Sequence, residues 1–143
     1  MILHEHLPAA RHAVENALTR YLAAVDARGL EGVLAVLEHA TVGFGGGPTR
    51  GRDDLATTYG GVFAAGRATR HLLFAVHVDV DDENPTLLRA RATYQRWSLD
   101  EAPPRLVALG DYTAGFACVD GPGSTTVQVA LQSLTVSRDW QEI

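Results

Sequence analysis

Apolar residues recur every three or four positions between Pro8 and Asp26, which predicts an amphipathic helix. Pro8 is well placed in the first turn of such a helix, because its missing N–H would have no partner there in any case. Gly29 is expected to follow the helix end, since glycine adopts the left-handed conformation that often terminates helices. The expected apolar stripe consists of Val14, Ala17, Leu18, Tyr21, Leu22 and Val25.

Two more helices are expected before the middle of the chain. The first covers 30–39 and the second runs from about 53 to 66, with Asp53 or its neighbour as a candidate cap. Between them, 41–44 has the composition of a short strand, and a glycine-rich turn follows it.

The second half of the chain changes to stretches with the two-residue period of strands, separated by short segments rich in Asp, Gly and Pro. Strands joined by short turns form an antiparallel meander. Helices followed by such a sheet predict an α+β fold, and 143 residues suit a single domain over 1–143. The four expected strands are 69–80, 87–98, 106–119 and 125–137, and one of the turns is Asp120-Gly121-Pro122-Gly123.

The first of these strands has two faces of different character. Its even positions, from Leu72 to Val80, are all apolar, whereas its odd positions include His71 and His77. Simple alternation therefore buries the even face and exposes His71. For His71 to face the interior, either a dimer partner must cover the other face or a bulge must turn the strand.

Composition excludes several classes of function. The net charge of −5 disfavours nucleic acid and anionic membranes as general partners. All twelve positive residues are Arg, so no lysine can form a Schiff base or bind phosphate in a Walker-type loop. The single cysteine, Cys118, cannot form an internal disulfide, and a cytoplasmic protein is the expectation.

Four motifs in a fixed order resemble the SnoaL-like branch of the nuclear transport factor 2-like superfamily, which includes relatives of polyketide cyclases, scytalone dehydratase and ketosteroid isomerase. They are Tyr21-Leu22-Ala23-Ala24-Val25-Asp26 in the first helix, Gly51-Arg52-Asp53, Thr69-Arg70-His71 and Gly110-Asp111-Tyr112. The resemblance implies a cystatin-like cone, in which N-terminal helices pack on a curved, mainly antiparallel sheet around an apolar pocket. It also implies a homodimer.

The candidate catalytic residues are His71, Asp26 and Tyr112. A neutral imidazole can take or give a proton near pH 7, and burial of Asp26 beneath its helix would raise the pKa of its carboxyl. The resemblance implies that Asp26 lies beside His71, and it singles out Tyr112 as a hydroxyl donor to a carbonyl group. An exposed Asp26 beside Arg28, or a histidine that only hydrogen-bonds near the sheet rim, are the structural alternatives.

Tyr21, Tyr59, Phe63 and Tyr94 are candidate substrate-binding walls, although aromatic residues on apolar faces are more often simply core. Two departures from the family favour a protein without catalytic activity. Position 75 is Ala where many relatives carry Asn, and no histidine follows His77 to supply a second catalytic imidazole. Four arginines of the second half are expected at solvated sheet positions, with pairing of one of them to a substrate carboxylate as the alternative: Arg89, Arg91, Arg96 and Arg105.

The expected function is therefore that of an acid/base enzyme that uses neither a metal ion nor an organic cofactor. Its substrate would be a small, mostly apolar carbonyl compound, and the reaction a cyclisation, dehydration or isomerisation. The alternative is a non-catalytic binding or assembly domain, such as the β subunits of ring-hydroxylating dioxygenases. The expected partners are a small apolar molecule and a second copy of the chain, with no nucleic acid and no membrane.

Overall fold

The computed structural model describes residues 3–119 and 127–142. A short 3₁₀ helix precedes three α-helices, and the long first helix carries its buried stripe where the sequence predicts it. The helices are α1 (Leu7–Asp26), α2 (Leu30–Val36) and α3 (Arg52–Ala64). None of the described helices is long and apolar enough to cross a membrane.

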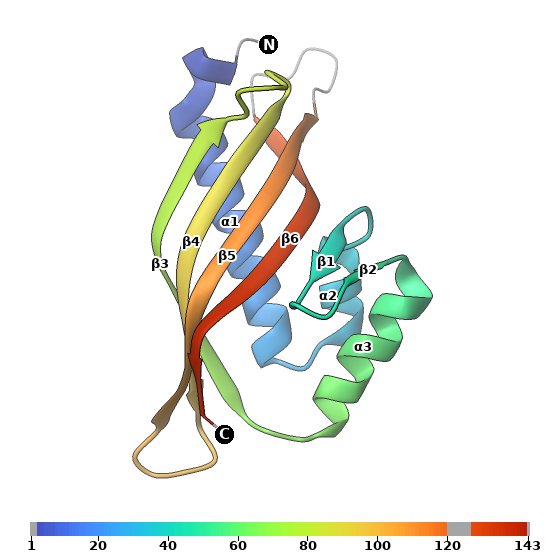
Figure 1. The fold of residues 1–143 in the computed structure, drawn as a ribbon, viewed down its shortest axis with the longest axis vertical. Helices are drawn as coiled ribbons and strands as arrows, with labels where there is room; N and C mark the ends of the chain where they lie inside the picture. Colours follow the sequence, from blue (N-terminus) through green and yellow to red (C-terminus); the bar gives the residue numbers. More distant parts are fainter. Residues whose placement is uncertain (1–2, 120–126, 143) are drawn as a thin grey trace.

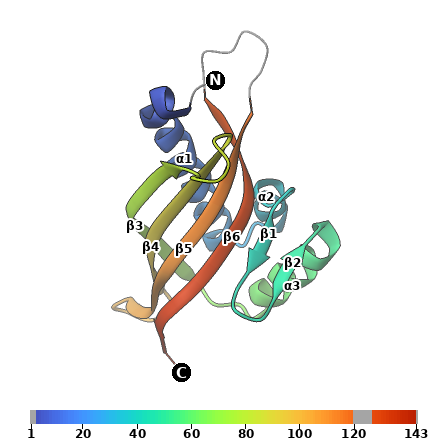
Figure 2. The same ribbon diagram turned by 45° about the horizontal axis from the view of Figure 1, so that its top comes forward.

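Six strands form one sheet in the order β2-β1-β6-β5-β4-β3 (Figures 1 and 2). All neighbouring strands are antiparallel except β1 and β6, which run parallel. Each of the last four strands is antiparallel to the next, as the meander prediction requires. The strands are β1 (Thr41–Gly43), β2 (Pro48–Arg50), β3 (Thr69–Val80), β4 (Leu87–Ser98), β5 (Arg105–Val119) and β6 (Gln128–Gln141).

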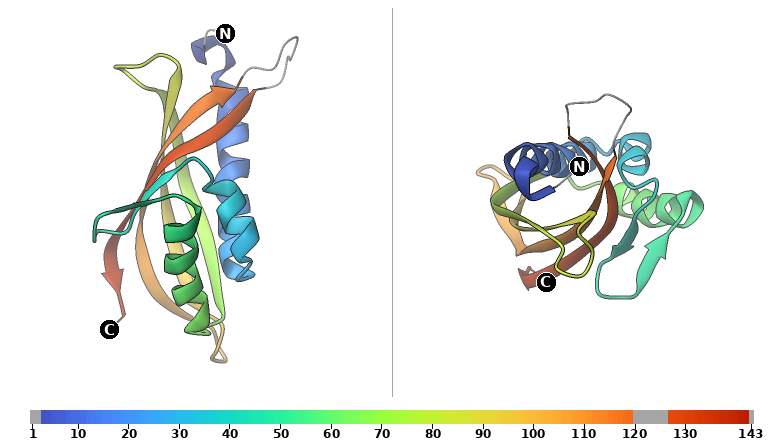
Figure 3. Two further views of the ribbon diagram at one scale, coloured as in Figure 1. Left: turned by 90° about the vertical axis from the view of Figure 1, so that its right-hand side faces the viewer. Right: turned by 90° about the horizontal axis from the view of Figure 1, so that it is seen from above.

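The long strands curl into an open cone, and α1 lies along its concave side (Figure 3). Buried side chains of α1, α2 and the inner strand faces make one continuous core beneath the helices. Apolar burial of this kind contributes about 25 cal/mol per Å². The α+β fold, with N-terminal helices on a curved and mainly antiparallel sheet, is therefore confirmed.

Two details of the helix ends differ from the predictions. Arg28, not Gly29, adopts the left-handed conformation after α1 (φ 54°), because its N–H and that of Gly29 bond back to carbonyls of the last turn. Gly51, with φ 90°, stands at the start of α3, and Asp53 lies inside its first turn. The predicted turn at 120–123 and the first predicted residues of the last strand, 125 and 126, lie outside the described residues.

A bulge in β3 determines which side chains reach the interior. Ala75 has a φ of 51°, and the pairing with β4 shifts between Phe74 and His77. Before the bulge, His71 and Leu73 point inward, whereas after it the inward residues are at even positions and end at the buried Val80. The bulge thus turns His71 toward the helices and His77 toward the outside, although their spacing along a regular strand would place them on one face.

Candidate active site

The C-terminal end of α1 meets the beginning of β3, and this junction brings Asp26 and His71 together. The Oδ1 atom of Asp26 lies 2.6 Å from Nδ1 of His71, and its Oδ2 accepts the His71 backbone N–H at 2.8 Å. The hydroxyl of Thr69 donates to Oδ1 at 3.1 Å. The side chains are only 10% (His71) and 15% (Asp26) exposed, so the two groups interact largely out of water.

These contacts set the charge of the carboxyl group. Burial alone raises the pKa of Asp26, but the hydrogen bonds from the His71 ring, the His71 N–H and Thr69, together with the charge of His71, outweigh it and lower the pKa. Burial therefore acts in the expected direction, but the net shift of the pKa is downward because the hydrogen-bond donors outweigh it. Asp26 stays ionised at neutral pH despite its unfavourable place at a helix C-terminus.

An ionised carboxylate can only accept hydrogen bonds, so Nδ1 of His71 must carry the proton that it shares with Asp26. In the neutral ring, Nε2 then has the free lone pair. The arrangement therefore holds His71 in one tautomer and leaves Nε2 as a base.

A row of aromatic rings leads from His71 into the core. Tyr94 lies 6.3 Å from the His71 ring and stacks on Tyr112 at 4.6 Å between ring centroids. Burial, followed by the nearby Tyr21, Tyr94 and Asp26, raises the pKa of Tyr112 well above its ordinary value, so that this hydroxyl is a donor and not a base.

The Tyr112 side chain is almost fully buried, since the residue is 4% exposed. It makes no hydrogen bond within the described part of the chain, where every fully buried side-chain nitrogen and oxygen does have a partner. It follows that the hydroxyl keeps some contact with accessible space. A hydroxyl that stays protonated can donate a hydrogen bond to a developing oxyanion, although the nearby negative charge of Asp26 opposes that oxyanion.

The remaining predicted wall residues lie further from His71. Tyr21 follows Tyr112 at 6.4 Å, and its hydroxyl is 2.6 Å from that of Tyr59. Phe63 packs on Tyr59 at 6.1 Å from the side of α3. The structure therefore places Tyr94 and Tyr112 beside the Asp26–His71 pair, whereas Tyr21 and Tyr59 satisfy each other inside the core.

Two further residues bear on this site, Thr69 and Arg96. Thr69 orients Asp26, and its place two residues before His71 in the predicted strand was the available signal. Arg96 was expected in solvent, but it is half-buried on the concave face and pairs directly with His71 across β3 and β4. The sequence signal for this face is alternation, because Arg96 lies two residues from each of the buried Tyr94 and Ser98 on β4.

Ala75 and His77 lie outside this site, and the lack of a histidine after His77 stays a departure from the family. Ala75 is exposed at the bulge in a left-handed conformation, which Asn also tolerates, so an Asn side chain there would not point at His71. His77 is exposed and pairs with Asp79 at 2.9 Å on the outer face. Neither residue bears on the chemistry of the Asp26–His71 pair.

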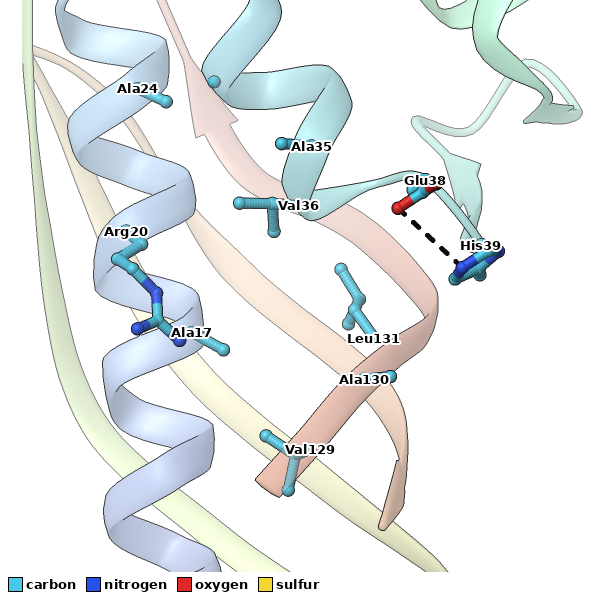
Figure 4. Close-up of a pocket in the computed structure, with 11 residues that line it drawn as sticks. Ala17, Arg20, Ala24, Ala35, Val36, Glu38, His39, Val129, Ala130 and Leu131 are labelled. Carbon is cyan, nitrogen blue, oxygen red and sulfur yellow. Dashed lines mark ion pairs between the residues drawn. The ribbon is translucent and has the colours of Figure 1, made fainter. Parts of the chain in front are cut away.

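A hollow of about 420 Å³ adjoins the site and is lined by Asp26, Thr69 and Leu99, among others. An open groove of about 530 Å³ lies elsewhere, between α1, α2 and β6, with the Glu38–His39 pair at its rim (Figure 4). None of the predicted site residues lines this groove. Its walls include Ala17, Ala24, Gly32, Ala35, Val129 and Leu131.

Solved structures of three proteins are similar to this one, at identities that establish the fold alone. A candidate scytalone dehydratase from Novosphingobium aromaticivorans is 20% identical, with a TM-score of 0.70 over 92% of this chain and 85% of its own. The β subunit of a candidate aromatic-ring-hydroxylating dioxygenase from the same organism is 18% identical (TM-score 0.72; 96% and 94% covered). The hexachlorocyclohexane dehydrochlorinase LinA-type3 from Novosphingobium barchaimii is 14% identical (TM-score 0.73; 94% and 89% covered).

None of the curated proteins matches the chain. The model of the SnoaL-like domain matches residues 8–122, which include α1, the Asp26–His71 pair and the tyrosines beside it. The chain therefore belongs to the SnoaL-like family of the nuclear transport factor 2-like superfamily.

Proposed function

We propose that the protein is an acid/base enzyme that removes a proton next to a carbonyl group of a small, mostly apolar substrate, with no metal ion or organic cofactor. The observation that carries the proposal is the 2.6 Å contact between Asp26 and Nδ1 of His71, which leaves Nε2 as a base. Its likeness to a candidate dehydratase and a dehydrochlorinase supports a proton-transfer reaction, since both names denote eliminations.

In this mechanism Nε2 of His71 takes the proton, and the ionised Asp26 stabilises the imidazolium that forms. The Tyr112 hydroxyl donates a hydrogen bond to the oxygen of the resulting enolate. Return of the proton to another carbon completes an isomerisation, loss of a β-hydroxyl as water completes a dehydration, and attack on a second carbonyl carbon closes a ring.

Exchange of the α-protons of 2-tetralone in D₂O, followed by NMR, tests the proposal without knowledge of the natural substrate. We expect the wild-type protein to accelerate the exchange over buffer, and His71→Ala to lose at least about 100-fold of that acceleration. His77→Ala is the matched control and should keep it, because this histidine lies exposed on the outer face. Exchange that is no faster than in buffer, or equal in His71→Ala, would refute the enzyme.

The second candidate is a non-catalytic assembly domain, favoured by the likeness to a dioxygenase β subunit and by the apolar side chains on the outer sheet face. It predicts that His71→Ala changes neither proton exchange nor the binding of a partner. The exchange experiment therefore separates the two functions.

We also propose that the protein forms a homodimer through the outer face of the sheet. The exposed Leu72 and Phe74 lie on this face of β3, and pairing across the sheet aligns Leu72 with Leu109 and the exposed Trp140. A two-fold contact would cover this row, which is apolar except for Gln95 of β4, with its own copy.

Sedimentation equilibrium at micromolar concentration should therefore give twice the mass of 15.3 kDa. Phe74→Asp should shift the protein to the monomer, because it places a charge in the contact. Val62→Asp, at a position 61% exposed on α3, should leave the dimer intact. A wild-type monomer under these conditions would contradict the proposal.

With Cys118 as its single cysteine, the protein is further proposed to be cytoplasmic.

A further inference from the structure

Two arginines lie near the candidate base, the half-buried Arg96 and the exposed Arg138. Arg96 projects from β4 directly opposite His71, where facing side chains are about 5 Å apart at Cβ. Arg138 lies on β6. It pairs with Gly110 of β5, which in turn pairs with Tyr94 of β4. Burial raises the pKa of Tyr94, and the charges of Arg138 and Arg96 oppose this rise, which places both guanidinium groups near its hydroxyl.

Neither arginine has a carboxylate partner among residues 3–119 and 127–142. Other arginines of the chain do, and the outward-facing Arg91 of the same strand, for example, binds Asp111 at 3.3 Å. Asp26 is engaged by His71 and Thr69, and Asp139 occupies the bulge of β6 without pairing with either arginine.

The surroundings of Arg96 disfavour its positive charge. Burial, followed by the charge of Arg138, lowers the pKa of Arg96, and Arg67 acts in the same direction. A guanidinium that is half-buried, close to like charges and without a counter-ion is stabilised when an anion binds. Planar carboxylates fit it best, because both of their oxygens can accept from its parallel N–H groups.

We propose that Arg96 and Arg138 form a carboxylate-binding subsite beside His71. That the bound carboxylate belongs to the substrate rests on the proposed function. The substrate would then be an aromatic or polyketide acid. With its carboxylate on Arg96, the apolar part of such a molecule would extend along the rings of Tyr94 and Tyr112, which brings its carbonyl group toward Nε2 of His71.

NMR titration of the purified protein tests the subsite. The two ligands are 2-naphthoate and its neutral counterpart 2-naphthamide. We expect saturable binding of 2-naphthoate, tighter than that of 2-naphthamide by at least about tenfold. Arg96→Gln and Arg138→Gln should each remove this preference, because each weakens the binding of 2-naphthoate more than that of 2-naphthamide. The matched control is Arg91→Gln, on the outer face of the same strand, and it should behave as the wild type.

The melting temperature distinguishes ligand binding from a structural role. Arg96→Gln should melt at the same temperature as the wild type or higher, since it removes charge repulsion. Failure of 2-naphthoate to bind, equal affinity for the amide, or tighter binding of inorganic phosphate would each overturn the proposal. An Arg96-dependent preference for 2-naphthoate without catalysed 2-tetralone exchange would refute the enzyme but keep the subsite, and the converse result would refute only the subsite.

Discussion

Replacing Asp26 by Asn is expected to lower the rate of catalysed proton exchange by about 100-fold or more while leaving the protein folded. The amide has one oxygen where the carboxylate has two, so its NH₂ group must face one of the donors that Asp26 now binds. The substitution also removes the negative charge of Asp26. This charge stabilises the imidazolium of His71 and fixes the tautomer of the neutral ring.

The same substitution has a predicted signature in stability. The pKa of Asp26 is lowered in the folded protein, so its contribution is present above the ordinary value of about 3.9 and is lost as the pH falls through the folded value. We expect the free energy of unfolding of Asp26→Asn to be about 1–3 kcal/mol lower than that of the wild type at pH 7. This difference should shrink toward pH 3.

Urea unfolding at both pH values measures this difference. Asp79→Asn is the matched control, because Asp79 also pairs with a histidine of β3 but is 59% exposed on the outer face. It should change neither exchange nor stability by more than about 0.5 kcal/mol. A difference between wild type and Asp26→Asn that is unchanged at pH 3 would contradict the assignment of an ionised, stabilising carboxylate.

Gly110→Ala is expected to be the most damaging single-methyl change in the sheet. A Cβ at this position would overlap the carbonyl oxygen of Ser137 and come within 2.8 Å of the Tyr94 ring. The backbone of β6 cannot move away without breaking its pairing, and Tyr94 cannot move without leaving Tyr112. The glycine therefore lets the Tyr94 ring lie flat over β5, between His71 and Arg138.

We expect Gly110→Ala to cost about 3 kcal/mol or more in the free energy of unfolding, or to prevent folding. Gly43→Ala in β1 is the control, since a Cβ there would meet nothing within 4 Å and should change stability by less than about 1 kcal/mol. Chemical denaturation of both variants checks this. Stability of Gly110→Ala equal to that of Gly43→Ala would show that Tyr94 is not held across this glycine.

Local signals predict the fold well because each element is consistent with its own pattern. The stripe of α1 and the alternation of β4 state which face is buried, and the structure agrees. The bulge at Ala75 is different, since a left-handed alanine has no marker in the sequence and its effect reverses the face of every residue beyond it. Alternation alone therefore could not place His71.

The sequence predicts which residues form the site better than it predicts their pKa shifts and charges. Asp26 and His71 came from the family resemblance, and the structure brings them together. The direction of the Asp26 pKa depended on three donors, of which the His71 backbone N–H and Thr69 act only once α1 packs against β3. The role of Arg96 likewise depended on its neighbours across the sheet, which no single segment specifies.

The central claim is that Asp26 holds His71 with its proton on Nδ1 and a free lone pair on Nε2. Long-range ¹H–¹⁵N NMR of the protein at about pH 8.5 reads the tautomer of each histidine ring directly. We predict that His71 is protonated at Nδ1 in the wild type and loses this strict preference in Asp26→Asn. A His71 ring protonated at Nε2 in the wild-type protein would contradict the account.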